Sequence, residues 1–128
     1  METTSSSIKV LIADDESIVR KGLKSTVPWA KYGMEVVADA ANGRKAWEAF
    51  QEHQPQVVIT DIVMPEMDGI ELARRAAELD PDIKIMFITG FAAVALNSDS
   101  NAPKHAKVLS KPIHLRELVN EVQKMLAA

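Results

Sequence analysis

The sequence predicts an α/β fold in which helices cover both faces of a parallel β-sheet. Five short apolar runs, rich in β-branched residues, are spaced along the 128 residues. Uninterrupted runs of this kind are typical of strands that are buried on both faces. Segments with apolar residues at helical spacing lie between most of them, and this alternation of strand and helix indicates a parallel sheet.

The five expected strands are short, and each is followed by polar or turn-forming residues. They cover residues 8–13, 34–38, 56–61, 83–89 and 106–110. Right-handed crossovers between parallel strands leave few arrangements for such a chain. The common arrangement at this size is the flavodoxin-like order 2-1-3-4-5, a doubly wound (βα)5 fold.

The helices are predicted from apolar spacing and from residues that begin or end a helix. They are expected over residues 17 to about 27, around residues 46–50, over residues 69–79 and over residues 112–125. Pro28 must stop the first helix, and Asp68 has the side chain of an N-cap for the third. Residues 97–103 are polar and run into Pro103, so the fourth helix of the fold should be short or irregular.

Charge and composition disfavour several classes of protein. The chain has 15 basic and 18 acidic residues and no basic block, which disfavours nucleic-acid binding. It has no cysteine, and therefore no disulfide, thiol nucleophile or cysteine-based zinc site. No apolar run reaches the length of a membrane span, and residues 1–7 lack the apolar segment of a signal peptide. We expect a cytoplasmic protein with a disordered lead at residues 1–7 and one domain at residues 8–128.

Residues with chemical function lie at the ends of four expected strands, on one edge of the sheet. They are Asp14 and Asp15 after the first strand, Asp61 at the end of the third, Thr89 at the end of the fourth and Lys111 after the fifth. In the order 2-1-3 the first and third strands are neighbours about 5 Å apart, so the three carboxylates should converge. Open α/β sheets bind their ligands at this edge.

Converging carboxylates favour a bound divalent cation, because two carboxylates about 5 Å apart repel by roughly 3 kcal/mol at an effective dielectric constant near 20. Oxygen ligands in a partly solvated cleft suit Mg2+, with Mn2+ as an alternative. Val63 would add only its backbone carbonyl. A cation, Lys111 and the Thr89 hydroxyl beside a carboxylate are the groups needed for phosphoryl transfer. Asp61 is the expected nucleophile and would form an aspartyl phosphate.

Together, these motifs resemble the receiver domain of two-component response regulators over nearly all of residues 8–126. The matching elements are Asp14-Asp15, the stretch from Asp61 to Gly69, Thr89-Gly90 and Lys111-Pro112. The resemblance implies that a histidine kinase or a phosphotransfer protein donates a phosphoryl group to Asp61. It also implies slow self-dephosphorylation rather than a conventional enzyme activity, with Thr89 as the switch hydroxyl and Lys111 as the phosphoryl contact.

Two features depart from the receiver pattern. Receivers usually carry Tyr or Phe three residues before the lysine. This chain has Val108 there, a side chain that is stiff at χ1 and too small for a rotamer switch. The second feature is the polar stretch 97–103 in place of a regular fourth helix. Both lie on the surface through which many receivers signal.

Two parts of the chain resemble different receivers. From about residue 60 onward, notably in residues 87–97 and 106–112, the chain is similar to CpdR-type single-domain receivers, which control regulated proteolysis in alphaproteobacteria. Residues 8–55, with Val27-Pro28-Trp29 and the stretch 40–43, resemble receivers of AraC-type DNA-binding regulators. We therefore predict a recombined or designed chimera with a junction within residues 56–69.

The leading interpretation is a phosphorylated switch that acts through protein contacts. The expected partners are the kinase or phosphotransfer protein and a downstream protein such as a protease adaptor target. The chain itself is expected to be a monomer or a weak dimer. One alternative is a metal-dependent phosphohydrolase, although such enzymes typically need a second carboxylate two residues after the nucleophile, where this chain has Val63. The other alternative is a constitutive adaptor or engineered scaffold with altered or lost switching.

Overall fold

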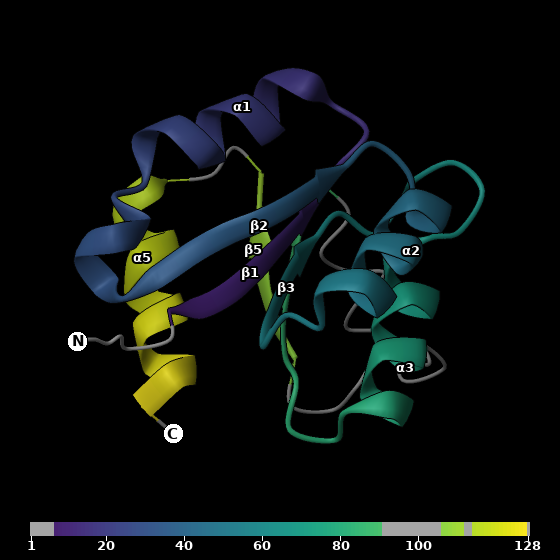
Figure 1. The fold of residues 1–128 in the computed structure, drawn as a ribbon. Helices are drawn as coiled ribbons and strands as arrows, with labels where there is room; N and C mark the ends of the chain where they lie inside the picture. Colours follow the sequence, from purple (N-terminus) through teal and green to yellow (C-terminus); the bar gives the residue numbers. More distant parts are fainter. Residues whose placement is uncertain (1–6, 91–105, 112–113, 128) are drawn as a thin grey trace.

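Five parallel strands form the sheet of the computed structural model, in the predicted order β2-β1-β3-β4-β5 (Figure 1). The structure describes residues 7–90, 106–111 and 114–127. The strands are β1 (Ile8–Ala13), β2 (Met34–Ala40), β3 (Val57–Thr60), β4 (Lys84–Thr89) and β5 (Lys107–Ser110). Each strand lies where the sequence predicts it, with small differences at the ends.

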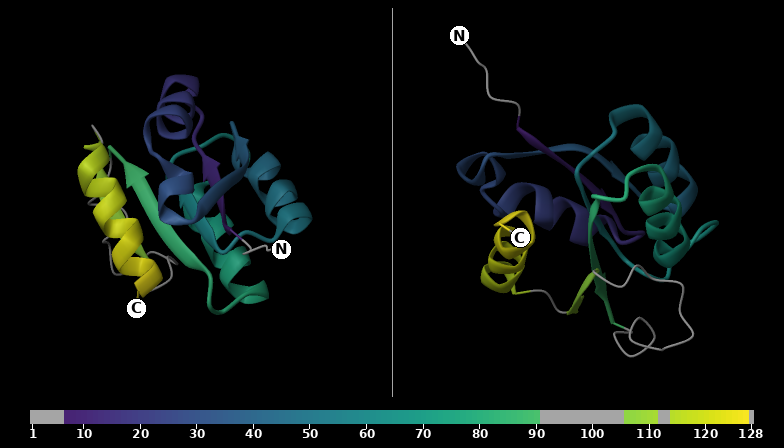
Figure 2. Two further views of the ribbon diagram at one scale, coloured as in Figure 1. Left: turned by 60° about the vertical axis from the view of Figure 1, so that its left-hand side comes forward. Right: turned by 90° about the horizontal axis from the view of Figure 1, so that it is seen from below.

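The helices lie in two layers, one on each face of the sheet. Within the described residues they are α1 (Ser17–Thr26), the short 3₁₀ helix η1 (Trp29–Tyr32), α2 (Gly43–His53), α3 (Gly69–Leu79) and α5 (Leu115–Ala127). Helices α2 and α3 cover one face, and α1 and α5 cover the other (Figures 1 and 2). The predicted irregular fourth helix lies outside the described residues. No helix in the described part of the chain is long and apolar enough to cross a membrane.

Successive residues of the central strands face opposite helix layers. Leu11 and Val58 belong to an apolar cluster that contains the buried side chains of α2 and α3. Val10 and Ile59 belong to a second cluster, which contains those of α1 and α5. Because both faces are covered, all four residues of β3 are buried, which explains why the three residues before Thr60 are all apolar.

The end of β2 and the start of α5 differ from the prediction by two residues or more. Strand β2 continues to Ala40, beyond the expected end at residue 38, because its pairing with β1 extends until Ala13 lies opposite Ala40. This edge strand also has an irregular register, in which Val37 is skipped; such bulges protect exposed sheet edges. Helix α5 begins at Leu115 rather than at the predicted residue 112.

Side-chain caps begin α2 and α3. The Asn42 side chain accepts a hydrogen bond from the Lys45 N–H at 2.8 Å, and the Asp68 side chain accepts one from the Glu71 N–H at 2.8 Å. Each bond satisfies an amide that has no partner within its own helix. The predicted role of Asp68 as an N-cap is therefore confirmed.

Gly43→Ala should destabilise the fold, whereas Gly22→Ala should stabilise it. A Cβ at Gly43 would stand 1.7 Å from the Met67 carbonyl oxygen, and overpacking against backbone costs about 1–3 kcal/mol. Gly22 lies within α1 and has open space at its Cβ position. Alanine there should therefore raise the free energy of unfolding, by about 1 kcal/mol at most. Urea unfolding curves measure both changes. Equal stability of the two variants would contradict the packing described.

Candidate functional site

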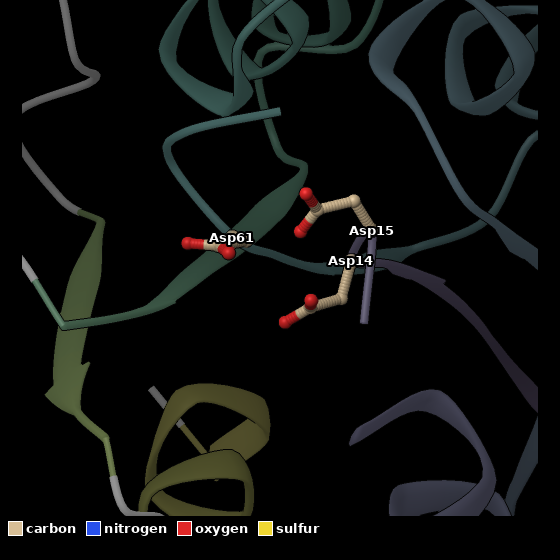
Figure 3. Close-up of side chains that lie close together, drawn as sticks. All are labelled: Asp14, Asp15 and Asp61. Carbon is tan, nitrogen blue, oxygen red and sulfur yellow. The ribbon is translucent and has the colours of Figure 1, made fainter. Parts of the chain in front are cut away.

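Three carboxylates meet at the carboxyl edge of the sheet (Figure 3). Asp14 and Asp15 follow β1, and Asp61 follows the neighbouring strand β3. The Asp61 N–H donates to the Ala13 carbonyl at 2.8 Å, which fixes the two strand ends side by side. One carboxylate oxygen from each aspartate lies within 4.8 Å of the other two. The convergence predicted from strand order is confirmed.

Asp61 is held firmly and is almost fully buried, with 6% of its surface exposed. Its Oδ1 accepts a hydrogen bond from the Ile62 N–H at 2.7 Å, while Oδ2 lies 3.1 Å from Lys111 Nζ. The Thr60 hydroxyl donates to the Asp61 carbonyl at 2.8 Å. Gly69 packs against the same carbonyl, so closely that a Cβ there would stand 1.9 Å from the oxygen. The main chain of Asp61 is therefore fixed by Thr60 and Gly69. Its carboxylate is held by the Ile62 N–H and the lysine.

Asp14 is fully buried, and one of its oxygens lacks a hydrogen bond. Its Oδ1 accepts the Glu16 N–H at 2.8 Å. Its Oδ2 lies 3.0 Å from Lys111 Nζ, but this ion contact lacks hydrogen-bond geometry. Among the described residues, Oδ2 is the only buried side-chain nitrogen or oxygen without a hydrogen-bond partner. Burial raises the pKa of Asp14, and this effect outweighs the Glu16 N–H and the Lys111 charge, which both lower it.

Lys111 carries the positive charge of the site. Its ammonium contacts Glu16 Oε1 at 2.6 Å, in addition to Asp14 and Asp61. Burial works against the charged form of the lysine, but the close contacts with these three carboxylates outweigh it and raise the pKa of Lys111. The Lys111 N–H donates to the Thr89 carbonyl at 2.9 Å, which ties the lysine to the end of β4.

The structure thus brings Asp14, Asp15, Asp61 and Lys111 together. Thr89 is buried at the end of β4, opposite Ser110 of β5 in the sheet register. Val63 lies in the loop after Asp61 and is 56% exposed.

The sequence prediction missed two residues of the site, Glu16 and Arg20. Arg20 Nη1 donates to the Asp14 carbonyl at 2.7 Å, and its Nε lies 3.0 Å from Asp39 Oδ2 on β2. It therefore holds the Asp14 main chain while linking α1 to the edge strand. Burial works against the ionised form of Asp39, but Lys24 and Arg20 outweigh it and lower the pKa of Asp39. The sequence holds only a weak signal for the role of Glu16 in the site. A glutamate stands at the N-cap position of the first helix, for which this residue type is poorly suited.

The donor set fits a small divalent cation. All three side chains of the cluster offer carboxylate oxygens, and the unsatisfied Asp14 Oδ2 has a lone pair available in a buried position. Ligands of this type suit Mg2+, which keeps part of its water shell. The acidic triad is therefore a candidate site for a divalent cation, whereas the backbone carbonyl of Val63 as a further ligand stays a prediction.

Residues 10–123 match the family described as the response regulator receiver domain. The chain belongs to this family, and it is thus a receiver domain of two-component signalling.

Two relatives support the two finer resemblances seen in the sequence, one each, and a third is a receiver solved with Mg2+. Response regulator receiver protein CpdR of Brucella abortus is 59% identical over 120 residues, which cover 94% of this chain and 98% of that protein. A two-component transcriptional regulator AraC from Clostridium phytofermentans has 31% identity and a TM-score of 0.77, with coverage of 93% and 91%. The CheX–CheY–BeF3–Mg2+ complex of Borrelia burgdorferi contains a chain with 26% identity and a TM-score of 0.78, with coverage of 93% and 89%.

Similarity to CpdR and to AraC-type receivers is therefore confirmed. The CpdR match covers 94% of the chain, so it is not limited to the residues after 60. The division of the chain into two ancestries stays a prediction.

Asp14→Asn should stabilise the metal-free protein and abolish its stabilisation by Mg2+. Since burial raises the pKa of Asp14, the folded state binds the proton more tightly than the unfolded chain does. Ionisation of Asp14 therefore costs stability as the pH rises above its ordinary pKa of 3.8. The gain from Asp14→Asn should be absent below that pH and grow above it.

Thermal unfolding at several pH values, with and without Mg2+, measures these effects. At 100 times its Kd, Mg2+ should stabilise the wild type by about 2.7 kcal/mol and leave Asp14→Asn unchanged. Asp15 is exposed, so Asp15→Asn should weaken Mg2+ binding without the gain in stability. A metal-free Asp14→Asn protein less stable than the wild type at neutral pH would contradict the cost assigned to Asp14.

Proposed function

We propose that Asp61 accepts a phosphoryl group from a histidine kinase or a phosphotransfer protein, in a Mg2+-dependent reaction. The observation that carries this proposal is the environment of the two Asp61 oxygens. Oδ1 is occupied by the Ile62 N–H, whereas Oδ2 faces the Lys111 ammonium at 3.1 Å. We therefore assign the attack to Oδ2, and Lys111 would contact the phosphoryl group that Oδ2 receives.

The proposed transfer forms one bond as another breaks. Asp61 Oδ2 attacks the phosphorus of a phosphohistidine, and the P–N bond breaks as the P–O bond forms. The histidine nitrogen keeps the electron pair and is protonated. When bound by Asp14, Asp15, Asp61 and the Val63 carbonyl, Mg2+ would neutralise charge on the phosphoryl oxygens. In the slow self-dephosphorylation, a water oxygen attacks the phosphorus and the P–O bond to Asp61 breaks, which releases inorganic phosphate and returns Asp61 to the carboxylate.

The output we propose is a contact with another protein that changes on phosphorylation, with a protease adaptor target as one such partner. Thr89 is the proposed switch hydroxyl, because it is the last residue of β4 and its own carbonyl accepts a hydrogen bond from the main-chain N–H of Lys111. A hydrogen bond from its hydroxyl to the phosphoryl group would pull on the ends of β4 and β5 together. This coupling supports a signal that leaves the site through these strands.

One observation favours the second candidate, an adaptor with altered switching. Val108 of β5 lies opposite Phe87 and packs, partly buried, against the apolar cluster under α2 and α3. A valine in this position has no ring to turn, and its χ1 angle is restricted. The aromatic relay of other receivers is therefore replaced or lost in this protein.

A small phosphodonor such as acetyl phosphate, with Mg2+, should label the protein once. Asp61→Asn should lose the label, because an amide oxygen is a poor nucleophile. Intact-mass spectrometry measures the incorporation. Asp68→Asn is the matched control: it changes an aspartate in the same loop, and asparagine caps a helix as well as aspartate does, so labelling should persist.

Undiminished labelling of Asp61→Asn would refute Asp61 as the acceptor. Labelling of the wild type that changes no partner binding would favour the constitutive adaptor. Repeated turnover of phosphate monoesters would instead favour a phosphohydrolase.

A further inference from the structure

Glu16 makes the shortest ion contact of Lys111. The Glu16 Oε1 to Lys111 Nζ distance is 2.6 Å, against 3.0 Å for Asp14 Oδ2 and 3.1 Å for Asp61 Oδ2. Glu16 and Lys111 are 95 residues apart in the chain. Their contact exists because the start of α1 and the residue after β5 meet at the same edge of the sheet.

Glu16 also occupies a position for which glutamate is poorly suited locally. It is the N-cap of α1, where Ser, Thr, Asp or Asn would bind the free amide groups of the first turn. The Glu16 side chain makes no capping hydrogen bond. It extends to Lys111 instead, so its contribution lies in the site rather than in the helix.

The Lys111 ammonium has three donor hydrogens, and three carboxylates surround it. A cation held by the aspartate cluster would engage two of these carboxylates, those of Asp14 and Asp61. Glu16 is not part of that cluster. It therefore stays available to Lys111 when the aspartates bind a cation.

We propose that Glu16 is a positioning residue for Lys111. Glu16 holds the lysine ammonium beside the site and releases it to the phosphoryl group. This inference rests on the proposed function. Lys111 held by Glu16 competes less with a cation for Asp14 and Asp61, so Glu16 favours metal binding. Glu16 also competes with the phosphoryl group for Lys111, so it disfavours the phosphorylated state.

Glu16→Gln tests both effects, because it removes the charge and keeps the size of the side chain. We expect the Kd for Mg2+ to rise about threefold and the Kd for beryllofluoride, at saturating Mg2+, to fall about threefold, as suits a partly exposed ion pair. Amide NMR titrations of the full chain measure both constants without turnover.

A double-mutant cycle separates this contact from a general effect of charge. In a Lys111→Met background, Glu16→Gln should leave the Mg2+ affinity unchanged, because its partner is already gone. Glu66→Gln is the matched control, since Glu66 is an exposed acid of the β3–α3 loop that pairs with Arg44 at 3.2 Å. It should change neither constant.

Three results would overturn the inference while leaving the proposed function intact. They are unchanged constants in Glu16→Gln, an effect that persists without Lys111, and an equal effect of Glu66→Gln. A wild-type protein that binds neither Mg2+ nor beryllofluoride would overturn the proposed function and the inference with it.

Discussion

The neighbouring positions of β1 and β3 constrain the rest of this molecule. Neighbouring strands are about 4.8 Å apart, and the hydrogen bond from Asp61 N–H to the Ala13 carbonyl keeps the two strand ends together. The aspartates that follow these strands therefore cannot move apart to relieve their repulsion. A positive charge has to be supplied, and Lys111 supplies it from 50 residues beyond Asp61. The lysine reaches the carboxylates because β5 pairs with β4 at the same edge.

The site costs stability that the two apolar clusters offset. Asp14 is fully buried with one oxygen unsatisfied, an arrangement that a protein selected only for stability would avoid. On either side of the sheet, however, the central strands are packed against helices, with β3 wholly buried. The apolar core compensates for the cost of the acidic edge of the sheet. A cation bound at that edge would relieve part of this cost.

The loop after β3 matters as much as the aspartates, because it sets where Asp61 stands. Gly69 packs against the Asp61 carbonyl, and Gly43 packs against the Met67 carbonyl, so the starts of α3 and α2 both press on the loop. Glu66 adopts a left-handed backbone conformation, with φ of 71°, which costs a non-glycine residue some energy. Close packing on both sides holds this conformation in place. The loop is therefore closely packed where it carries Asp61.

The sequence by itself determined the strands, most of the helices and the meeting of the three aspartates. Apolar runs report burial locally, and parallel strands bring their carboxyl ends to one edge, so Asp14, Asp15 and Asp61 follow from strand order alone. Only the tertiary structure decided the contact of Glu16 with Lys111, the link from Arg20 to the Asp14 carbonyl, and the end of β2 at Ala40. Each of these depends on the direction of a side chain or on the register of a neighbouring strand. Such long-range contacts leave no periodic pattern in the chain, because they arise only when elements distant in sequence pack together.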